Sequence, residues 1–189
     1  MSDTVCVYCS SSSDIDDDYF EVAETMGRAL AEGRHRLVYG GGQVGLMGRL
    51  AEAVHEQGGS VVGVIPEALR DKEGVAYDVA DEMVVTGTMQ ERKAEMYSRA
   101  DAFVALPGGF GTLEEFMEVL TLKQLGYHRK ALVLVNTGGF YDALIRFFEQ
   151  LYDQDFARRQ HGELYHLADD PSGAMTYLEE YRAAPQEEA

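Results

Sequence analysis

The residues best suited to chemistry form a glycine-rich turn, Pro107-Gly108-Gly109-Phe110-Gly111-Thr112, directly after the apolar run Phe103–Leu106. Its glycines let the backbone approach a ligand closely and adopt positive φ angles. Thr112 is predicted to open a helix, so that unpaired backbone N–H groups and the positive end of the helix dipole face this turn. The pattern predicts an anion site that suits a phosphate group, with a turn that only connects two elements as the alternative.

Two carboxylates, Glu114 and Glu115, follow the turn. Thr112 and Glu115 have the spacing of a capping box, in which the Glu carboxylate accepts a hydrogen bond from the backbone N–H of the cap residue. This spacing alone does not separate a capping role from a catalytic role. Because two acids beside a phosphate repel it, we expect one of them to face a sugar instead.

A second glycine-rich turn, Gly40-Gly41-Gly42-Gln43-Val44-Gly45, has the G-x-G-x-x-G form and lies between a predicted strand and a predicted helix. Glu67 follows the next strand, about where a ribose-binding acid lies in dinucleotide-binding folds. However, the turn follows the second strand, and 189 residues leave little room for the substrate domain of a dehydrogenase. We interpret the turn as a second lip of the same ligand site, with Gly41 and Gly42 as candidate binding residues.

A cationic segment lies between the two turns. Arg92, Lys93 and Arg99 fall within eight residues of a predicted helix. An exposed helix face with i,i+4 ion pairs, such as Glu95–Arg99, would produce the same pattern. In a chain with 16 basic residues against 33 acidic ones, three cations next to a predicted phosphate site favour ligand binding.

Short β-rich runs alternate with amphipathic segments along the chain. Strands are predicted over Thr4–Ser10, Arg36–Tyr39, Ser60–Ile65, Glu82–Val85, Ala102–Leu106 and Ala131–Asn136. Helices are predicted over Asp17–Glu32, Gly45–Gln57, Thr88–Arg99, Thr112–Leu125, Tyr141–Asp153 and Ser172–Arg182, whereas residues 67–77 are predicted to be irregular.

The strand runs are apolar almost throughout, which indicates burial on both faces, and helices between them indicate right-handed crossovers. The predicted fold class is therefore α/β: a single Rossmann-like, doubly wound domain over residues 1–184, with a mainly parallel sheet, helices on both faces and a frayed tail at 185–189. In such sheets, ligands bind beyond the carboxyl ends of the strands, where both glycine-rich turns are expected.

The formal net charge of −17 excludes non-specific nucleic-acid binding, which needs a cationic surface. The apolar runs are too short to span a bilayer, and no secretory signal precedes the first strand. We therefore expect no nucleic-acid or membrane partner, and a cytoplasmic location. High salt would screen the self-repulsion of so acidic a surface, so we interpret the chain as halophilic.

Cys6 and Cys9 have C-x-x-C spacing but lie along a predicted buried strand, where residues three apart point to opposite faces. We interpret both as inert core cysteines. The five histidines show no metal-ligand spacing, and no lysine lies in an obvious cofactor-binding context. We therefore expect neither a metal nor a cofactor.

Taken together, Met89-x-x-Arg92-Lys93 and Pro107-Gly-Gly-x-Gly-Thr-x-x-Glu115 resemble the LONELY GUY (LOG) family of cytokinin riboside 5′-monophosphate phosphoribohydrolases, formerly labelled possible lysine decarboxylases. The resemblance extends from Cys9-Ser10-Ser11 through both glycine-rich turns to about Phe148. It implies a Rossmann-like fold, a homodimer with the site near the subunit interface, and no metal. Gln90 departs from the family, which often has His there.

The resemblance also implies roles for individual residues, with Arg92 and Glu115 matching the catalytic pair. Glu73 matches a further binding acid, with a one-residue difference in spacing. Other positions that match nucleotide-lining residues are Lys93, Gly109, Phe110, Gly111, Thr112, Leu113, Glu114 and Thr121. Position in the two turns and on the cationic helix adds Gly108, Gly41, Gly42 and Arg99 as candidate binding residues.

The implied reaction hydrolyses the N-glycosidic bond of a nucleoside 5′-monophosphate, AMP or N6-modified AMP, to free base and ribose 5-phosphate. Glu115 would stabilise an oxocarbenium-like transition state or orient water, while Arg92 would hold the departing base or the sugar phosphate. Two alternatives stay open: a non-catalytic nucleotide-binding or carrier module on the same fold, and an amino-acid decarboxylase. The decarboxylase would need a Schiff-base lysine, and none of the four lysines is placed for that role.

Overall fold

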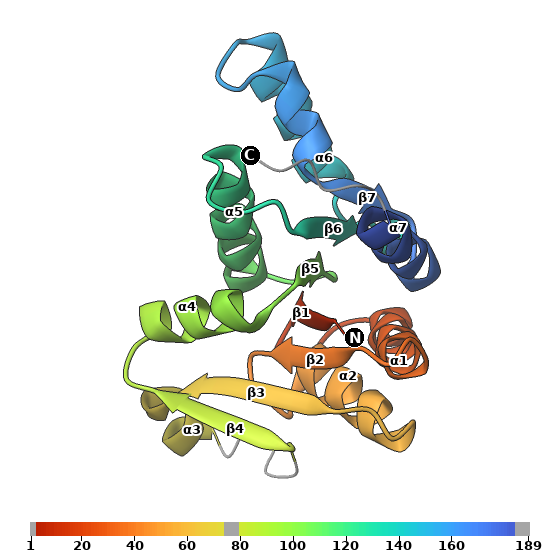
Figure 1. Ribbon diagram of the computed structural model, residues 1–189, viewed down its shortest axis with the longest axis vertical. Helices are drawn as coiled ribbons and strands as arrows, with labels where there is room; N and C mark the ends of the chain where they lie inside the picture. The colour runs from red at the N-terminus through yellow and green to blue at the C-terminus, as the bar shows by residue number, and fades with distance from the viewer. Residues whose placement is uncertain (1–2, 74–79, 184–189) are drawn as a thin grey trace.

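The computed structural model describes residues 3–73 and 80–183, without the side chains of residues 71–73 and 183. The described residues form one parallel sheet with the strand order β4-β3-β2-β1-β5-β6-β7 (Figure 1). The strands are β1 (Thr4–Tyr8), β2 (Arg36–Tyr39), β3 (Val61–Pro66), β4 (Glu82–Thr86), β5 (Ala102–Ala105), β6 (Ala131–Val135) and β7 (His166–Ala168). The helices are α1 (Asp17–Glu32), α2 (Gly45–Glu56), α3 (Glu67–Glu73), α4 (Met89–Arg99), α5 (Phe110–Gln124), α6 (Asp142–Asp153) and α7 (Pro171–Ala183), with 3-10 turns η1 (Thr137–Gly139) and η2 (Arg159–Leu164).

The strand order reverses between β1 and β5. The chain adds β2, β3 and β4 on one side of β1 and then returns to place β5 on the other side. The carboxyl ends of β1 and β5 therefore diverge into loops that leave toward opposite faces, which is the switch point where doubly wound sheets bind ligands. This topology confirms the predicted α/β class.

Helices cover both faces of the sheet, and each face has its own hydrophobic core. On one face α1, α2 and α7 contribute Met26, Leu50 and Leu178; on the other α4, α5 and α6 contribute Met96, Phe116 and Phe148 (Figure 1). Side chains of β1 alternate between these cores. Burial on both faces explains why the strand runs are apolar almost without interruption.

The two cysteines of β1 and its following loop lie in different cores. Cys6 belongs to the core under α4 and α5, whereas Cys9 belongs to the core under α1 and α2. Both thiols are free and buried, and burial raises the pKa of each. The predicted placement on opposite faces is confirmed, and the raised pKa disfavours the reactive thiolate.

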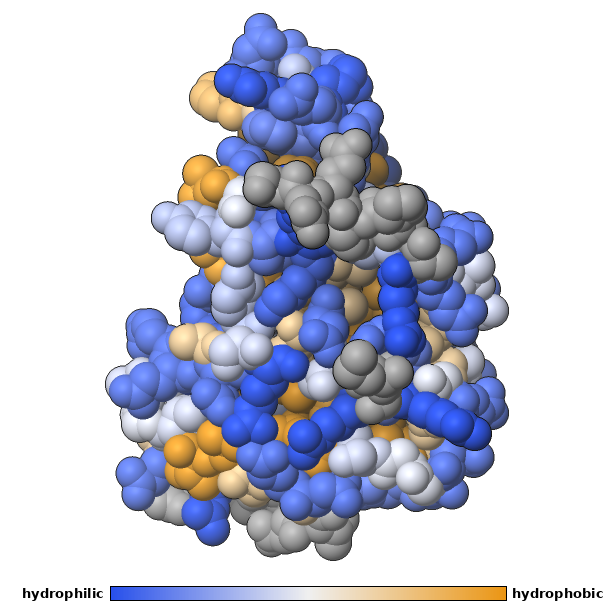
Figure 2. Space-filling model, viewed as in Figure 1, coloured by the Kyte–Doolittle hydropathy of each residue, from blue (hydrophilic) through white to orange (hydrophobic). Residues whose placement is uncertain are grey.

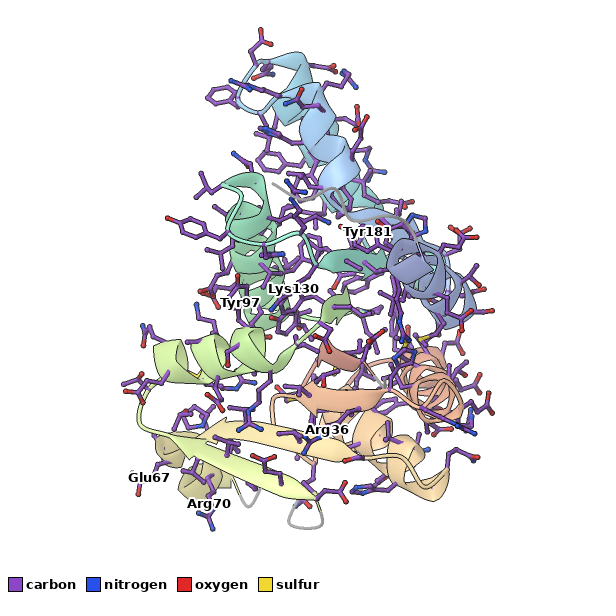
Figure 3. The ribbon with its side chains drawn as sticks, viewed as in Figure 1. Arg36, Glu67, Arg70, Tyr97, Lys130 and Tyr181 are labelled. Carbon is purple, nitrogen blue, oxygen red and sulfur yellow. The ribbon has the colours of Figure 1, made fainter. Side chains whose placement is uncertain are left out.

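Two elements of the structure, α3 and β7, were not predicted from the sequence. Residues 67–73 form α3, because this polar segment, Glu67-Ala-Leu-Arg-Asp-Lys-Glu73, consists mostly of strong helix formers. Figure 3 shows Glu67 and Arg70 on this helix at the edge of the molecule; the rest of the predicted irregular segment, 74–77, lies outside the described residues. The last strand is β7, whose three residues pair with β6 and are too short to give a periodic signal.

The surface is strongly hydrophilic. On the face drawn in Figure 2, hydrophilic residues cover most of the area, and hydrophobic residues gather at the centre of the face and at its lower left. Among the described residues, no helix combines the length and hydropathy that a membrane crossing requires.

Candidate active site

A cavity of about 410 Å³ opens at the switch point. Its walls come from residues 10–12 after β1, Gly40 and Gly42 after β2, Ile65 of β3, and residues 109–112 at the start of α5. A larger cavity of about 470 Å³ lies at the opposite, amino-terminal edge of the sheet. We place the candidate site in the first cavity, because parallel sheets bind ligands at the carboxyl ends of their strands.

A buried ion pair forms part of the wall of this cavity. Arg92 of α4 donates from Nη1 to Oε1 of Glu115 on α5 at 2.9 Å. Their side chains are only 10% and 8% exposed. Because isolated charges in a protein interior are strongly unfavourable, the two groups depend on each other for compensation. The residues that resemble the family's catalytic pair therefore lie together in the cavity.

Arg92 is held from a second side by the backbone of the sheet. Its Nε donates to the carbonyl oxygen of Val64 in β3 at 3.0 Å. The start of α4 is fixed by a capping box: Thr88 Oγ1 accepts from the N–H of Glu91 at 3.1 Å, and the Glu91 carboxylate accepts from Thr88 N–H at 3.2 Å. These contacts set both the helix and the direction in which Arg92 leaves it.

Glu115 lies where burial and charge act in opposite directions. Burial raises the pKa of its carboxyl above the ordinary glutamate range, the neighbouring Arg92 guanidinium lowers it, and Glu114 raises it again. The net direction is upward. A carboxylate that is poorly solvated and close to a cavity interacts strongly with positive charge that develops there.

The turn after β5 leads directly into α5. Gly109 is the N-cap residue, and its helix start has no side-chain hydrogen bond to the first N–H groups. Those N–H groups lack intrahelical partners, so they can donate to an anion. The helix begins at Phe110, two residues earlier than predicted, and Thr112 is buried within its first turn.

The capping-box explanation of Thr112 and Glu115 is wrong. Gly109 already caps the helix, so Thr112 does not occupy the cap position. The Glu115 carboxylate turns toward Arg92 instead of the preceding backbone. Thus the acid is used within the cavity and not to begin the helix.

Tyr141, which the sequence analysis did not identify, holds the glycine-rich turn from behind. It lies before α6, is buried, and donates from its phenol to the carbonyl oxygen of Leu106 at 2.7 Å. The backbone of Gly108 also hydrogen-bonds this phenol. From the other side, Ser10 N–H donates to the Pro107 carbonyl at 3.3 Å. The turn is therefore fixed at its base, ahead of the helix N-terminus.

Several predicted binding residues lie outside the lining of this cavity. Lys93 pairs with Glu114 and with Glu118, the latter at 2.7 Å. Arg99, at the far end of α4, contacts Glu95 at 2.6 Å and Glu82 at 2.8 Å. The structure therefore does not bring the three predicted cations together, because the helix carries Lys93 and Arg99 to other partners.

The remaining predicted positions divide in the same way. Gly42, Gly109, Phe110, Gly111 and Thr112 line the cavity. Outside its described lining are Gly41, Gly108, Leu113, Glu114 and Thr121. Thr121 Oγ1 donates to the carbonyl of Met117 on its own helix. The Glu73 side chain lies outside the described residues.

The sequence analysis also missed cavity residues that carry no motif. Met47 and Leu69 give it an apolar wall together with Ile65, and Ser10, Ser11 and Ser12 give it hydroxyl groups. The serine run directly follows β1 at the carboxyl edge of the sheet, and this position was a signal that could have identified it. Leu69 gave no such signal, because its segment is polar and shows no helical pattern of apolar residues.

Solved structures share this fold. The molybdenum cofactor carrier protein of Chlamydomonas reinhardtii aligns with a TM-score of 0.74 and 24% identity, over 97% of this chain and 100% of that chain. The molybdenum cofactor binding protein of Rippkaea orientalis aligns with a TM-score of 0.73 and 18% identity, over 95% and 97%. At this identity the likeness concerns the sheet and its helices alone.

Sequence relatives are closer. A family model described as "Possible lysine decarboxylase" matches residues 47–178. A probable cytokinin riboside 5′-monophosphate phosphoribohydrolase of Oryza sativa subsp. japonica is 47% identical over 94% of this chain and 78% of its own length. A cytokinin riboside 5′-monophosphate phosphoribohydrolase of Arabidopsis thaliana is 44% identical over 94% of this chain and 81% of its own length. With these matches over nearly the whole sequence, the chain belongs to the LONELY GUY (LOG) family.

Proposed function

We propose that this protein hydrolyses the N-glycosidic bond of a nucleoside 5′-monophosphate, AMP or N6-modified AMP, and releases the free base and ribose 5-phosphate. One observation carries the proposal: the buried Arg92–Glu115 pair lies in the same cavity as the N-terminus of α5. The proposed phosphate site and the Glu115 carboxylate lie about one helical turn apart. They can therefore contact the phosphate and the C1′ end of the same ribose 5-phosphate unit. The names of the relatives agree with this substrate class.

In the proposed mechanism, the 5′-phosphate binds the N–H groups at the start of α5. The carboxylate of Glu115 then faces the ribose and stabilises the positive charge that develops at C1′ as the bond to the base breaks. Water adds its hydroxyl to C1′, and its remaining proton goes to the departing base. Arg92 holds the carboxylate in place and presents positive charge to the base or the phosphate.

Glu115 acts in its ionised form in this scheme. Burial raises the pKa of its carboxyl. When the pH is lowered, Glu115 therefore takes up a proton at a higher pH than an ordinary glutamate does. Arg92 opposes the shift and keeps the carboxylate usable near neutral pH. The ion pair thus serves the reaction by controlling the protonation of its acid.

The older family description, a lysine decarboxylase, finds no support in the lysines that the structure describes. Lys93 pairs with two glutamates outside the cavity lining. Lys130 donates to the carbonyl of Tyr97 at 2.8 Å and lies over its ring at the start of β6, the opposite edge of the sheet (Figure 3). Burial lowers the pKa of Lys123 to about 8, but this side chain contacts Tyr181 near the C-terminal end of α5.

We further propose that the protein is a homodimer and is active in high salt. Large apolar side chains are exposed on α4 and α5, where Met89 is 42%, Met117 37% and Phe110 94% exposed. A second copy of the chain would cover this surface near the cavity. The net charge of −17 supports the salt requirement, because screening reduces self-repulsion. Light scattering in molar salt tests the dimer, and a monomer there would contradict it. Release of ribose 5-phosphate measured from low to molar salt tests the salt requirement, and full activity in low salt would contradict it.

The test of the proposed activity is release of ribose 5-phosphate from a panel of nucleoside monophosphates in molar salt. Wild type, Glu115→Gln and Glu118→Gln are compared. Glu118 is on the same helix but pairs with Lys93 at the surface, so its variant controls for loss of a glutamate as such. Release by wild type and Glu118→Gln that Glu115→Gln loses supports the hydrolase, and the preferred substrate identifies the base.

A different result would favour the carrier alternative. Tight binding of AMP without release of ribose 5-phosphate from any member of the panel contradicts the hydrolase. Isothermal titration of the same nucleotides with the same three proteins separates this outcome from a failure to bind.

A further inference from the structure

The glycine-rich turn after β2 lies against the catalytic arginine. A Cβ atom at Gly40 would overlap Nη2 of Arg92 and would lie 3.3 Å from its Cζ. The same atom would lie 2.9 Å from the Sδ of Met47, the flexible end of a side chain. Gly40 is not among the residues with positive φ, so its backbone conformation does not demand glycine. Glycine is needed at this position because Arg92 occupies the space that a side chain would fill.

Three sides of the guanidinium are now accounted for. Nε donates to the Val64 carbonyl at 3.0 Å, Nη1 donates to Glu115 at 2.9 Å, and Nη2 lies over Gly40. A guanidinium is planar, so its donors move together when one edge is pushed. A side chain at position 40 would therefore displace the whole group from both of its acceptors.

Neighbouring glycines of this turn also face protein atoms. Gly41 has φ +76° and would place a Cβ 3.1 Å from that of Ile65. Gly45 has φ +67° and would place a Cβ 2.6 Å from the backbone of Ser11 and Ser12. Close packing of protein segments thus accounts for Gly40, Gly41 and Gly45 of this turn without a phosphate, whereas Gly42 lines the cavity.

We propose that Gly40 is a positioning residue that acts through Arg92: its missing side chain leaves the slot in which the guanidinium reaches both Val64 and Glu115. The inference rests on the proposed hydrolase activity and adds to it the assignment of a residue outside the reacting groups. It also assigns Gly40 of the second glycine-rich turn to the protein's own arginine in place of the nucleotide phosphate.

Gly40→Ala is expected to lower kcat by about 10²-fold, the loss that follows a 1 Å misplacement of a catalytic group. KM should change less than kcat, since the N–H donors of α5 that are proposed to bind the phosphate keep their positions. The acid limb of the pH–rate profile should move to higher pH. Arg92 lowers the pKa of Glu115, so its displacement raises that pKa and reduces the ionised fraction at a given pH.

A double-mutant cycle separates this role from a general structural one. If Gly40 acts through Arg92, adding Gly40→Ala to Arg92→Ala should change kcat by less than about twofold, because the group it displaces is gone. The matched control is Gly59→Ala, whose Cβ would lie 2.6 Å from Val54 Cγ1 far from the cavity. This control should lower the melting temperature and leave the pH profile unchanged.

The cycle also covers the case in which Gly40→Ala does not fold. The double variant Gly40→Ala/Arg92→Ala should then regain the melting temperature of Arg92→Ala, since the overlap is removed. Three results would overturn the inference. The double variant could fail to fold, or the effects of the two single substitutions on kcat could multiply in it. Gly40→Ala could also have the kcat and the pH profile of wild type. If wild type itself releases no ribose 5-phosphate, the proposed function fails, and the melting temperatures still test the contact.

Discussion

The two glycine-rich turns differ in what surrounds their glycines. In the turn before α5, a Cβ at Gly109 or Gly111 would meet no atom within 4 Å. In the turn after β2, a Cβ at Gly40 or Gly45 would meet an arginine or a backbone at close range. Gly108 of the first turn is also tightly packed, since a Cβ there would overlap Oγ1 of Thr112. The contrast therefore concerns Gly109 and Gly111, which leave room for a ligand, and Gly40 and Gly45, which leave room for the protein.

Backbone conformation sharpens this difference. Gly109 has φ −89°, an angle that any residue adopts, and Gly111 lies inside the helix, where glycine is less stable than alanine. Neither conformation nor packing within the chain requires glycine at these two positions, which leaves open space beside the helix N-terminus. Gly45, with φ +67°, needs glycine for its own backbone. A glycine motif therefore predicts a ligand site only after its internal contacts are known.

The largest effect is expected at the ion pair that lies between the two turns. Arg92→Ala should lower kcat by about 10²–10³-fold, as for loss of one electrostatic group. It also leaves Glu115 buried without its partner, which should destabilise the fold by about 3–5 kcal/mol. Turnover and urea unfolding measure the two losses. An enzyme with wild-type turnover would remove Arg92 from the mechanism.

A substitution in the turn after β2 should change mainly the stability of the fold. Gly45→Ala combines a left-handed backbone with a close contact to Ser11 and Ser12, so we expect a loss of about 1–3 kcal/mol. Urea unfolding of wild type and variant gives the difference in unfolding free energy. Unchanged stability together with weaker nucleotide binding would indicate that Gly45 contacts the ligand. That result would contradict the difference between the two turns.

A substitution in the turn before α5 should instead weaken ligand binding and leave the fold at least as stable. Gly111→Ala should stabilise the fold by up to about 1 kcal/mol, because alanine is the better helix residue. Its methyl group also intrudes where the phosphate is proposed to bind, so KM should rise about tenfold, equivalent to about 1.4 kcal/mol. Initial rates and thermal unfolding are measured on the same samples. A stabilised enzyme with unchanged KM would argue that the phosphate lies elsewhere.

The smallest effect is expected from the hydrogen bonds behind the first turn. Tyr141→Phe removes the phenol that bonds Leu106 and Gly108, a loss of about 0.5–1.5 kcal/mol. If the turn loosens, KM should rise by a few fold. Tyr181→Phe is the matched control, since its phenol bonds the Arg129 carbonyl at the other edge of the sheet. Equal changes in KM for both variants would deny Tyr141 a role in the site.

Much of the fold followed from the sequence, because the pattern of buried strands and amphipathic helices is local. The helix Asp17–Glu32 and the strand Arg36–Tyr39 have the predicted bounds. The segment 67–73 forms a helix despite its polarity, because its residues have high helix propensity, and polarity alone therefore predicts its structure poorly. A three-residue edge strand such as β7 is defined by its partner strand and by no signal of its own.

The site was predicted in part for a similar reason. The spacing Thr-x-x-Glu occurs at Thr88–Glu91 and again at Thr112–Glu115. The structure uses the first as a capping box and gives the second acid to Arg92. The difference arises because Gly109 already caps α5, which depends on the path of the chain out of β5. Likewise, the contact between Gly40 and Arg92 depends on how β2, β3 and α4 meet, and no spacing in the sequence shows it.

The carbonyl of Val64, which accepts the hydrogen bond from Arg92, has a consequence for how such a site evolves. Every residue type at position 64 offers the same backbone oxygen, so substitutions there can follow the needs of the core without disturbing the arginine. Selection that keeps Arg92 in place would therefore not restrict which residue type occupies position 64. The restriction is expected instead at Gly40, where an added methyl group would overlap Nη2 of Arg92.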